Sequence, residues 1–515
     1  MIKKISIVLL SALAAVGCNS PMASSKCVRD CDKASSLKAY YGPTFEVASW
    51  KGEVSYQMIP DNFACEMKKY FGGFTFVKDG ISVELKTIRP IKYNNFAGSD
   101  HLSMRYDLVT NDSCAPVKIC KLTVSKDAKA GKVQLGPMTV KVVDRVLPPA
   151  SQWKYFLDLW QHPWAVSRFF NVEPFGDEHF KKMEPVYKTL AECGVKALTV
   201  TLLDYAWNHQ CYDAYGTMIE RVKNDDGSWS FDYTIFDKYV EFGRKCGIGP
   251  DIACYTMCPW GNVVRWKDSK GNTKSAKAAP GSDMFYDYWG AFLVDFKKHL
   301  IEKGWFKDTY IAMDERAPKD VAIIADFIQK KAPGMKIAMA GNRKPSEFKG
   351  IVIDNYCQYL YYLTPEFLTE TDDRRKKGYK TTFYVCCGPE RPNTFMCSID
   401  NEAFWLGMYP QLSGLDGFLR WAANSWPHNP YVDASFGPWR AGDTYLVYPN
   451  GEYSSRLLSL RSGVVVAEKL RILKEAGIGD KELKTFAEKY HFTKAGKKDF
   501  NFEACRKALE KFVNR

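Results

Sequence analysis

The chain has 515 residues, of which 46% are hydrophobic and 25% are charged, and its formal net charge is +13. These fractions are typical of a globular protein and exclude a low-complexity chain, while the length indicates two or three domains. The basic residues are scattered, with the densest runs at Arg374–Lys377 and Lys497–Lys498, and no nucleic-acid motif accompanies them. We therefore expect no nucleic-acid partner.

A targeting segment opens the chain. Lys3 and Lys4 form a charged start, Ile5–Val16 is almost entirely apolar, and small residues precede Cys18. The apolar run is too short for a permanent membrane-spanning helix, and no later run reaches about 18 apolar residues. The pattern resembles a bacterial lipobox and predicts a lipoprotein signal peptide over residues 1–18. Cys18 would then be lipidated and would anchor an exported protein to the cell envelope, at the outer membrane or the periplasmic face. The alternative is an ordinary secretory signal with an incidental Cys18.

A β-rich domain follows a short tether. Residues 19–36 are rich in Ser, Lys and Asp, as flexible tethers are. From residue 37 to 147, short β-rich runs such as Ile81–Leu85 and Met138–Val143 alternate with turns. Short, evenly spaced strands predict an antiparallel β-sandwich domain over residues 37–147. The prolines after Leu147 mark a linker.

Residues 150–475 alternate short apolar strands with longer amphipathic segments. The eight strand candidates are Tyr155–Trp160, Ala197–Leu203, Pro250–Tyr255, Thr309–Asp314, Lys336–Ala340, Ile351–Asn355, Thr381–Cys386 and Gly417–Trp421. The helix candidates Asp177–Cys193, Phe231–Cys246 and Met284–Lys303 are each followed by a glycine, as helix C-caps are. This alternation predicts a (β/α)8 barrel of the TIM type, with its active site at the C-terminal ends of the strands. Residues 476–515 are predicted to form a helical C-terminal appendage.

Aromatic and polar side chains gather at the predicted strand ends. The candidate substrate-binding residues are Trp160, His162, Trp207, Asn208, Trp260, Asn262, Asn355, Tyr356, Tyr384 and Trp421. Flat aromatic faces pack on the C–H face of a sugar ring, and planar polar groups bind its hydroxyls. A lone Trp is more often a core residue, and His162 alone is more often structural than catalytic. The recurrence of Trp at several strand ends nevertheless predicts a carbohydrate pocket.

The adjacent acids Asp314 and Glu315 end the fourth predicted strand. Two such close carboxylates push their pKa values apart, so that one stays ionised while the other keeps a proton. Glycosidic-bond cleavage needs that division, but neighbouring residues rarely face each other across the roughly 5 Å of the usual retaining mechanism. They suit a substrate-assisted variant, in which Asp314 polarises the substrate's acetamido group and Glu315 protonates the departing oxygen. The alternative interpretation is a strand end whose acids are solvated or paired with Arg316.

The 16 cysteines match no metal-ligand spacing, and we expect neither a metal nor a cofactor. Most of them lie in apolar runs, as small core residues do. Local disulfide candidates are Cys27–Cys31 and Cys114–Cys120. Cys386 and Cys387 are adjacent in the chain.

Together these features resemble glycoside hydrolase family 123. The strings that carry the resemblance are Leu157–Pro163, Met313-Asp314-Glu315, Phe418–Ala422 and Tyr445–Pro449, within residues 40 to 475. The resemblance implies an exo-acting, retaining β-N-acetylgalactosaminidase that forms an oxazoline intermediate from a carbohydrate substrate. It implies Asp314 as the acetamido-orienting residue and Glu315 as the general acid/base.

Two other functions stay open. One is a barrel glycosidase with separated carboxylates, pairing Glu315 with Asp158, Asp204 or Asp354. The other is a non-catalytic glycan-binding lipoprotein, although a pure binder gains little from adjacent carboxylates. The sequence also leaves open the preference between N-acetylgalactosamine and N-acetylglucosamine, because a single side chain facing the C4 hydroxyl can decide it.

Overall fold

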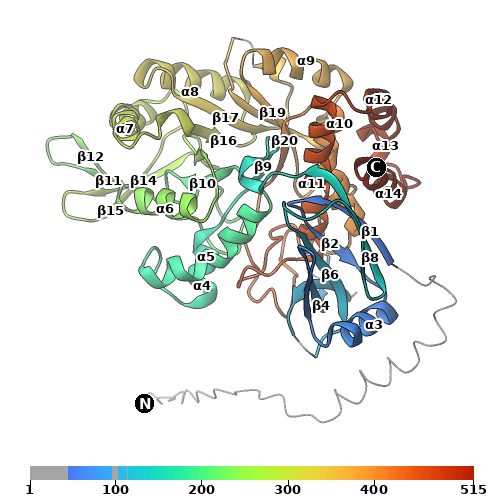
Figure 1. The fold of residues 1–515 in the computed structure, drawn as a ribbon. Helices are drawn as coiled ribbons and strands as arrows, with labels where there is room; N and C mark the ends of the chain where they lie inside the picture. The colour runs from blue at the N-terminus through green and yellow to red at the C-terminus, as the bar shows by residue number, and fades with distance from the viewer. Residues whose placement is uncertain (1–44, 96–101, 113, 349) are drawn as a thin grey trace, which may run out of the picture.

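The computed structural model describes residues 45–515 except 96–101, 113 and 349 (Figure 1). The predicted signal peptide, the lipidation site Cys18, the tether and the Cys27–Cys31 candidate lie outside the described residues. Within the described part of the chain, no helix is long and apolar enough to cross a membrane.

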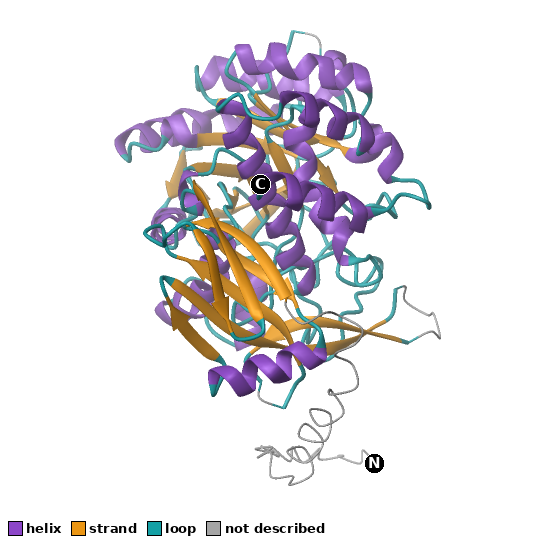
Figure 2. Cartoon of the chain, turned by 45° about the vertical axis from the view of Figure 1, so that its right-hand side comes forward, coloured by secondary structure: helices purple, strands orange, loops and turns teal. Residues whose placement is uncertain are grey.

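Two β-sheets form the N-terminal region and share one core. The first sheet has the strand order β1-β8-β7, and the second has the order β2-β6-β4-β3 with β5 paired to β4. Apolar side chains of both sheets, such as Val140 on one and Val83 and Leu122 on the other, are buried together. Figure 2 shows the strands of this region in orange, in the lower half of the view. The bounds are β1 Phe45–Lys51, β2 Val54–Met58, β3 Thr75–Lys78, β4 Ile81–Tyr93, β5 Ser103–Thr110, β6 Val117–Val124, β7 Gly131–Leu135 and β8 Met138–Val146.

The predicted all-β N-terminal region is confirmed, with two differences. First, β1 pairs with β8 in parallel, so the region is not wholly antiparallel. These are the first and last strands of the region, and every strand between them except β7 lies in the other sheet. Second, a helix that was not predicted, α3 (Asp61–Phe71), packs its buried Ala64 and Met67 onto the shared core.

Eight parallel strands form the barrel, in the order β10-β13-β16-β17-β18-β19-β20-β9. A bridge between Leu157 and Val195 brings β9 next to β10, and the side chain of Gln161 hydrogen-bonds across this seam to Thr199 and Ala197. The predicted TIM-type barrel is confirmed. The strand bounds are β9 Phe156–Leu159, β10 Ala197–Thr201, β13 Asp251–Tyr255, β16 Thr309–Met313, β17 Lys336–Gly341, β18 Asn355–Tyr359, β19 Lys380–Val385 and β20 Gly417–Arg420.

The sixth barrel strand lies four residues later than the sequence predicted. The prediction was Ile351–Asn355, whereas β18 begins at Asn355. The apolar run before Asn355 has the composition of a strand, but Val352 is 51% exposed. Asp354 instead marks the start of the strand, because its carboxylate accepts the Ile337 N–H at 2.9 Å. Asn355 therefore lies at the amino end of the strand, away from the expected catalytic face.

Helices surround the barrel, and the three predicted helices are present, with ends within three residues of the prediction. The helices are α4 Pro163–Phe170, α5 Asp177–Glu192, α6 Thr234–Lys245, α7 Asp283–Glu302, α8 Pro318–Lys331, α9 Pro365–Lys376, α10 Asp400–Ser413, α11 Ser455–Glu475, α12 Asp480–Lys489, α13 Phe492–Ala495 and α14 Phe502–Val513. A small sheet that was not predicted, in the order β12-β11-β14-β15, projects to one side (Figure 1). Its strands are β11 Glu220–Lys223, β12 Trp229–Asp232, β14 Val263–Asp268 and β15 Thr273–Lys277.

The C-terminal helices tie the barrel to the N-terminal sheets. The Trp405 indole on α10 donates to the Tyr490 carbonyl at 3.1 Å. The Trp50 indole on β1 donates to the Val513 carbonyl at the end of α14, at 2.8 Å. The predicted appendage thus bridges the other two parts of the molecule.

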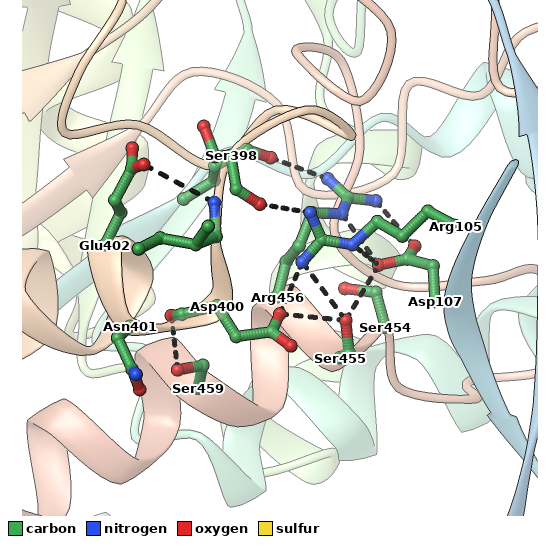
Figure 3. Close-up of polar contacts among 12 residues, drawn as sticks. Arg105, Asp107, Ser398, Asp400, Asn401, Glu402, Ser454, Ser455, Arg456 and Ser459 are labelled. Atoms are coloured by element: carbon green, nitrogen blue, oxygen red, sulfur yellow. Dashed lines mark hydrogen bonds and ion pairs between the residues drawn. The ribbon is translucent and has the colours of Figure 1, made fainter. Parts of the chain in front are cut away.

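A buried ion-pair network also fixes β5 to the barrel (Figure 3). Arg456 at the start of α11 donates two hydrogen bonds of 3.0 Å to Asp107, and Arg105 donates to Asp400 at 2.5 Å. Burial of Asp107 opposes its ionisation, but Arg456, Arg105 and the Tyr448 hydroxyl together outweigh this and lower the pKa of the carboxyl. Arg456 also donates to the Thr394 and Gly442 carbonyls. The N-terminal region thus helps to hold the loops that follow β19 and β20.

One buried acid predicts a pH-dependent stability. Asp158 on β9 is 5% exposed, and burial raises its pKa to about 7. Because its folded pKa exceeds its unfolded value, the folded state binds more protons, and stability falls as pH rises from about 4 to 7. As pH rises through that window, the free energy of unfolding of the parent is expected to fall relative to that of Asp158→Asn, by about 1.4 kcal/mol for each pH unit. Unfolding midpoints at pH 5, 6, 7 and 8 measure this; a constant difference across the series would contradict the assignment.

Candidate active site

A cavity of about 220 Å³ lies at the C-terminal ends of the barrel strands. This is the face on which barrel enzymes place their active sites. The lining residues are Trp160, Trp207, Gln210, Trp260, Asp314, Glu315, Ala340, Tyr384, Cys386, Cys387, Leu419, Trp421 and Trp439. Three larger clefts among the described residues, of about 850, 640 and 540 Å³, have other residues in their walls and contain neither Asp314 nor Glu315. The acidic pair therefore singles out the smaller cavity as the candidate site.

Asp314 is held by an indole and a guanidinium. Trp260 donates its ring N–H to Oδ2 at 2.5 Å, and an Arg316 nitrogen lies 2.9 Å from Oδ1. Arg316 is itself held by a hydrogen bond of 2.9 Å to the Cys258 carbonyl. Burial is the largest influence on Asp314 and raises its pKa, as does Glu315, while Arg316 and Trp260 oppose the rise. Oδ1 is itself buried, with the Arg316 guanidinium as its ion-pair partner.

Glu315 has different partners. The Tyr384 hydroxyl donates to Oε1, and the Asn342 amide donates to Oε2 at 3.3 Å. Burial and the neighbouring Glu315 raise the pKa of Tyr384, so the phenol stays protonated and remains a donor. The Tyr384 ring stacks on Tyr359, with 5.2 Å between centroids. The two adjacent acids are thus oriented by separate sets of side chains.

Aromatic rings form much of the cavity wall. Trp160 and Trp207 lie 5.0 Å apart between centroids, and both pack against Tyr255 below them. Trp421 and Trp439 meet edge to face at 6.0 Å. A small cavity with indole faces and two carboxylates has the composition expected of a sugar site.

Five of the ten predicted binding residues line this cavity together with the acidic pair. They are Trp160, Trp207, Trp260, Tyr384 and Trp421. Each lies at or just after the C-terminal end of its barrel strand, so its position in the chain was enough to predict it.

The other five predicted residues do not line the cavity. His162 is fully buried, stacks on Tyr215 at 3.6 Å, and has its pKa lowered to about 3 by burial. Asn208 and Asn262 occupy left-handed turns with φ of 52° and 55°, a role common for asparagine. The last two, Asn355 and Tyr356, lie at the amino end of β18, because that strand starts later than predicted. The Tyr356 hydroxyl donates to the Arg343 carbonyl.

Six cavity residues and one supporting residue were not nominated from the sequence. The cavity residues are Gln210, Ala340, Cys386, Cys387, Leu419 and Trp439, and the supporting residue is Asn342. Trp439 donates its indole N–H to the Gln210 carbonyl at 2.7 Å, which joins the loops after β10 and β20. In the sequence, Trp439 ends the aromatic-containing run Phe436–Trp439. Its hydrogen-bond partner, Gln210, lies more than 200 positions earlier in the chain.

The alternative carboxylates lie elsewhere. Asp158 is inside the barrel, and Asp204 accepts the Thr217 N–H at 2.8 Å. Asp354 is at the amino end of β18. None of the three is among the residues that line the cavity.

The Cys114–Cys120 disulfide candidate is wrong, because both thiols are free, and one is exposed while the other is buried in the core.

Comparisons with known proteins agree with this geometry. The barrel and its acid-bearing cavity define the class of barrel glycoside hydrolases, and residues 160–473 match the family model "Glycoside hydrolase 123, catalytic domain". The chain belongs to glycoside hydrolase family 123. No curated protein sequence matches it.

The fold also occurs in a solved structure. A family 123 glycoside hydrolase from Clostridium perfringens, described in terms of glycolipid glycan hydrolysis, has a TM-score of 0.76 at 22% identity, over 94% of each chain. A family 39 glycoside hydrolase from Bacteroides cellulosilyticus WH2 has a TM-score of 0.38 at 10% identity, over 82% of each chain. An exo-β-1,4-mannosidase from Opitutaceae bacterium strain TAV5 has a TM-score of 0.36 at 12% identity, over 62% of this chain and 60% of the other. The last two likenesses are too remote to support an argument.

Proposed function

We propose that this glycoside hydrolase is an exo-acting β-N-acetylgalactosaminidase that retains configuration by substrate-assisted catalysis. The observation that carries the proposal is the composition of the cavity wall. Its only carboxylates among the described residues are the adjacent Asp314 and Glu315. A mechanism with two facing carboxylates needs a second acid across the cavity, whereas an assisted mechanism needs one proton donor and one group that holds the amide.

The first step uses both acids. The substrate's acetamido N–H donates to the Asp314 carboxylate in the cavity wall, which turns the amide oxygen toward the anomeric carbon. That oxygen attacks as Glu315 gives its proton to the departing glycosidic oxygen, and the bond from the anomeric carbon to that oxygen breaks. Trp260 and Arg316 favour the ionised Asp314 that stabilises the positive charge of the oxazolinium ring.

The second step reverses the roles. Glu315 now accepts a proton from water, and the water oxygen attacks the anomeric carbon and opens the ring. Two inversions restore the starting configuration. Tyr384 and Asn342 keep Glu315 in place through both steps.

The cavity's size supports exo action. Its volume of about 220 Å³ is below the usual range of ligand pockets, about 300–1,000 Å³. It suits one terminal sugar ring, with Trp160, Trp207 and Trp421 as candidate platforms. Family 123 membership and the glycolipid work on the relative support a glycan or glycolipid as the parent substrate. The lipobox-like start supports the further proposal that Cys18 anchors the enzyme to a membrane.

Three aryl glycosides test the proposal. We expect hydrolysis of the N-acetyl-β-galactosaminide, slower hydrolysis of the N-acetyl-β-glucosaminide, and none of the β-galactoside that lacks the acetamido group. NMR of the first product is expected to show the β-anomer. Comparable turnover of the galactoside would favour a mechanism with separated carboxylates. Binding of the first substrate without any product would indicate a non-catalytic glycan-binding protein.

A further inference from the structure

Two adjacent thiols line the same cavity as the catalytic pair. Cys386 and Cys387 directly follow β19, and their Sγ atoms lie 3.8 Å apart. Cys387 is exposed and Cys386 is partly exposed, so a small molecule in the cavity can reach both. The proposed mechanism gives neither thiol a role.

The contact between the two sulfurs makes the pair nucleophilic. A hydrogen bond from Cys386 lowers the pKa of Cys387 to about 7, and the nearby Arg420 acts in the same direction, although burial and the carboxylates of Asp443 and Glu315 oppose them. The same contact raises the pKa of Cys386, which keeps its proton. Since the thiolate is the reactive form, Cys387 is reactive near neutral pH.

The other free thiols of the described residues are buried or lie outside this cavity. Eight free cysteines are buried, and burial raises the pKa of, for example, Cys254. The other exposed thiols are Cys114 and Cys397, which lie far apart in the chain and outside this cavity.

The geometry disfavours a direct disulfide. Neighbouring Cα atoms lie about 3.8 Å apart across a trans peptide, below the roughly 4.4–6.8 Å that disulfides prefer. Such a bond is strained and easily reduced. A bridging atom that bonds to both sulfurs requires less distortion of the backbone than a disulfide, because the two sulfurs need not approach each other to S–S bonding distance.

We propose that Cys386 and Cys387 form a modification site for thiophilic groups that bond to two thiols at once, the class of trivalent arsenicals. Capture of such a group fills the cavity beside Glu315 and stops hydrolysis. The effect on hydrolysis rests on the proposed function, whereas the capture itself does not.

The reaction requires no oxidant. An arsenic(III) oxide reacts with the two thiols; both S–H bonds break and two As–S bonds form. The oxide oxygen leaves with both protons as one water molecule, and arsenic stays trivalent. Because the second As–S bond forms within the chain, the product resists a monothiol, but a small dithiol competes for it.

Phenylarsine oxide and the full chain provide the test. Mass spectrometry is expected to show one phenylarsenic group per chain, and peptide mapping is expected to place it on Cys386 and Cys387. Hydrolysis of the N-acetyl-β-galactosaminide is expected to be lost, to return with 2,3-dimercaptopropanol, and not to return with an equal thiol concentration of mercaptoethanol.

Matched variants separate the pair from other thiols. Cys386→Ser and Cys387→Ser are each expected to fail to hold the group through a monothiol wash. The control C114S/C397S is expected to keep both the parent activity and the sensitivity to the arsenical. Three results would overturn the proposal: an adduct mapped to other cysteines, retention of the group by either serine variant, or isolation of the parent chain with this pair already joined as a disulfide. Because the mapping does not depend on turnover, it shows whether the two thiols capture the group even in a chain without hydrolase activity.

Discussion

Glu315→Gln is expected to lower kcat for an alkyl N-acetyl-β-galactosaminide by about 10³-fold, within the range of about 10² to 10⁴ that general acids contribute. Glutamine keeps the shape of the side chain and can still accept from Tyr384, so the cavity is expected to stay intact. It has no proton to give to the departing oxygen. Steady-state kinetics on substrates with good and poor leaving groups measure the effect.

The leaving-group dependence separates acid catalysis from a structural defect. A dinitrophenyl glycoside needs little protonation, so its first step is expected to suffer much less, and azide is expected to restore turnover with a β-glycosyl azide as the product. Glu347→Gln, an exposed carboxylate that pairs with Arg343, is the matched control and is expected to behave like the parent. An equal loss for every leaving group would show that Glu315 is not the proton donor.

Asp314→Asn is expected to lower kcat by about 10² to 10³-fold with little change in KM, as losses of transition-state electrostatic stabilisation do. The amide can still accept from Trp260, but it carries no charge to stabilise the oxazolinium ring. Because burial raises the pKa of Asp314, the parent's activity is expected to fall on acidification at a higher pH than an ordinary aspartate would give. The variant is expected to lack that limb of the pH profile.

Two further measurements bear on Asp314. A thiazoline that mimics the ring intermediate is expected to inhibit the parent and to bind the variant more weakly. Asp326→Asn, which removes a surface carboxylate paired with Lys330, is the control and is expected to leave both properties unchanged. An unaltered rate in Asp314→Asn would exclude the assisted scheme.

The sequence predicted most of the barrel because its strands are short, apolar and bounded by helices with glycine ends. It failed at β18, where an apolar run precedes the strand and Asp354, rather than a residue of the run, marks its start. That error carried Asn355 and Tyr356 into the predicted site. The parallel pairing of β1 with β8 joins strands from opposite ends of the N-terminal region, and local patterns do not record such pairing.

Within the site, residues at strand ends were predictable and residues in long loops were not. Asp314 directly follows β16 and Trp260 lies in the loop after β13, so the fold brings them together at the same end of the barrel. Trp439 reaches the cavity from the long segment after β20 and is held by the Gln210 carbonyl, a contact that only the folded chain defines. His162 has the right position in the chain, but it turns into the core against Tyr215.

The most direct measurement is a series of aryl N-acetyl-β-galactosaminides whose acetyl group carries zero, one, two and three fluorine atoms. If the amide oxygen is the nucleophile that Asp314 positions, each fluorine weakens it, and kcat/KM is expected to fall steeply along the series. A rate that does not change with fluorination would show that the amide takes no part in bond breaking and would contradict substrate-assisted catalysis by this enzyme.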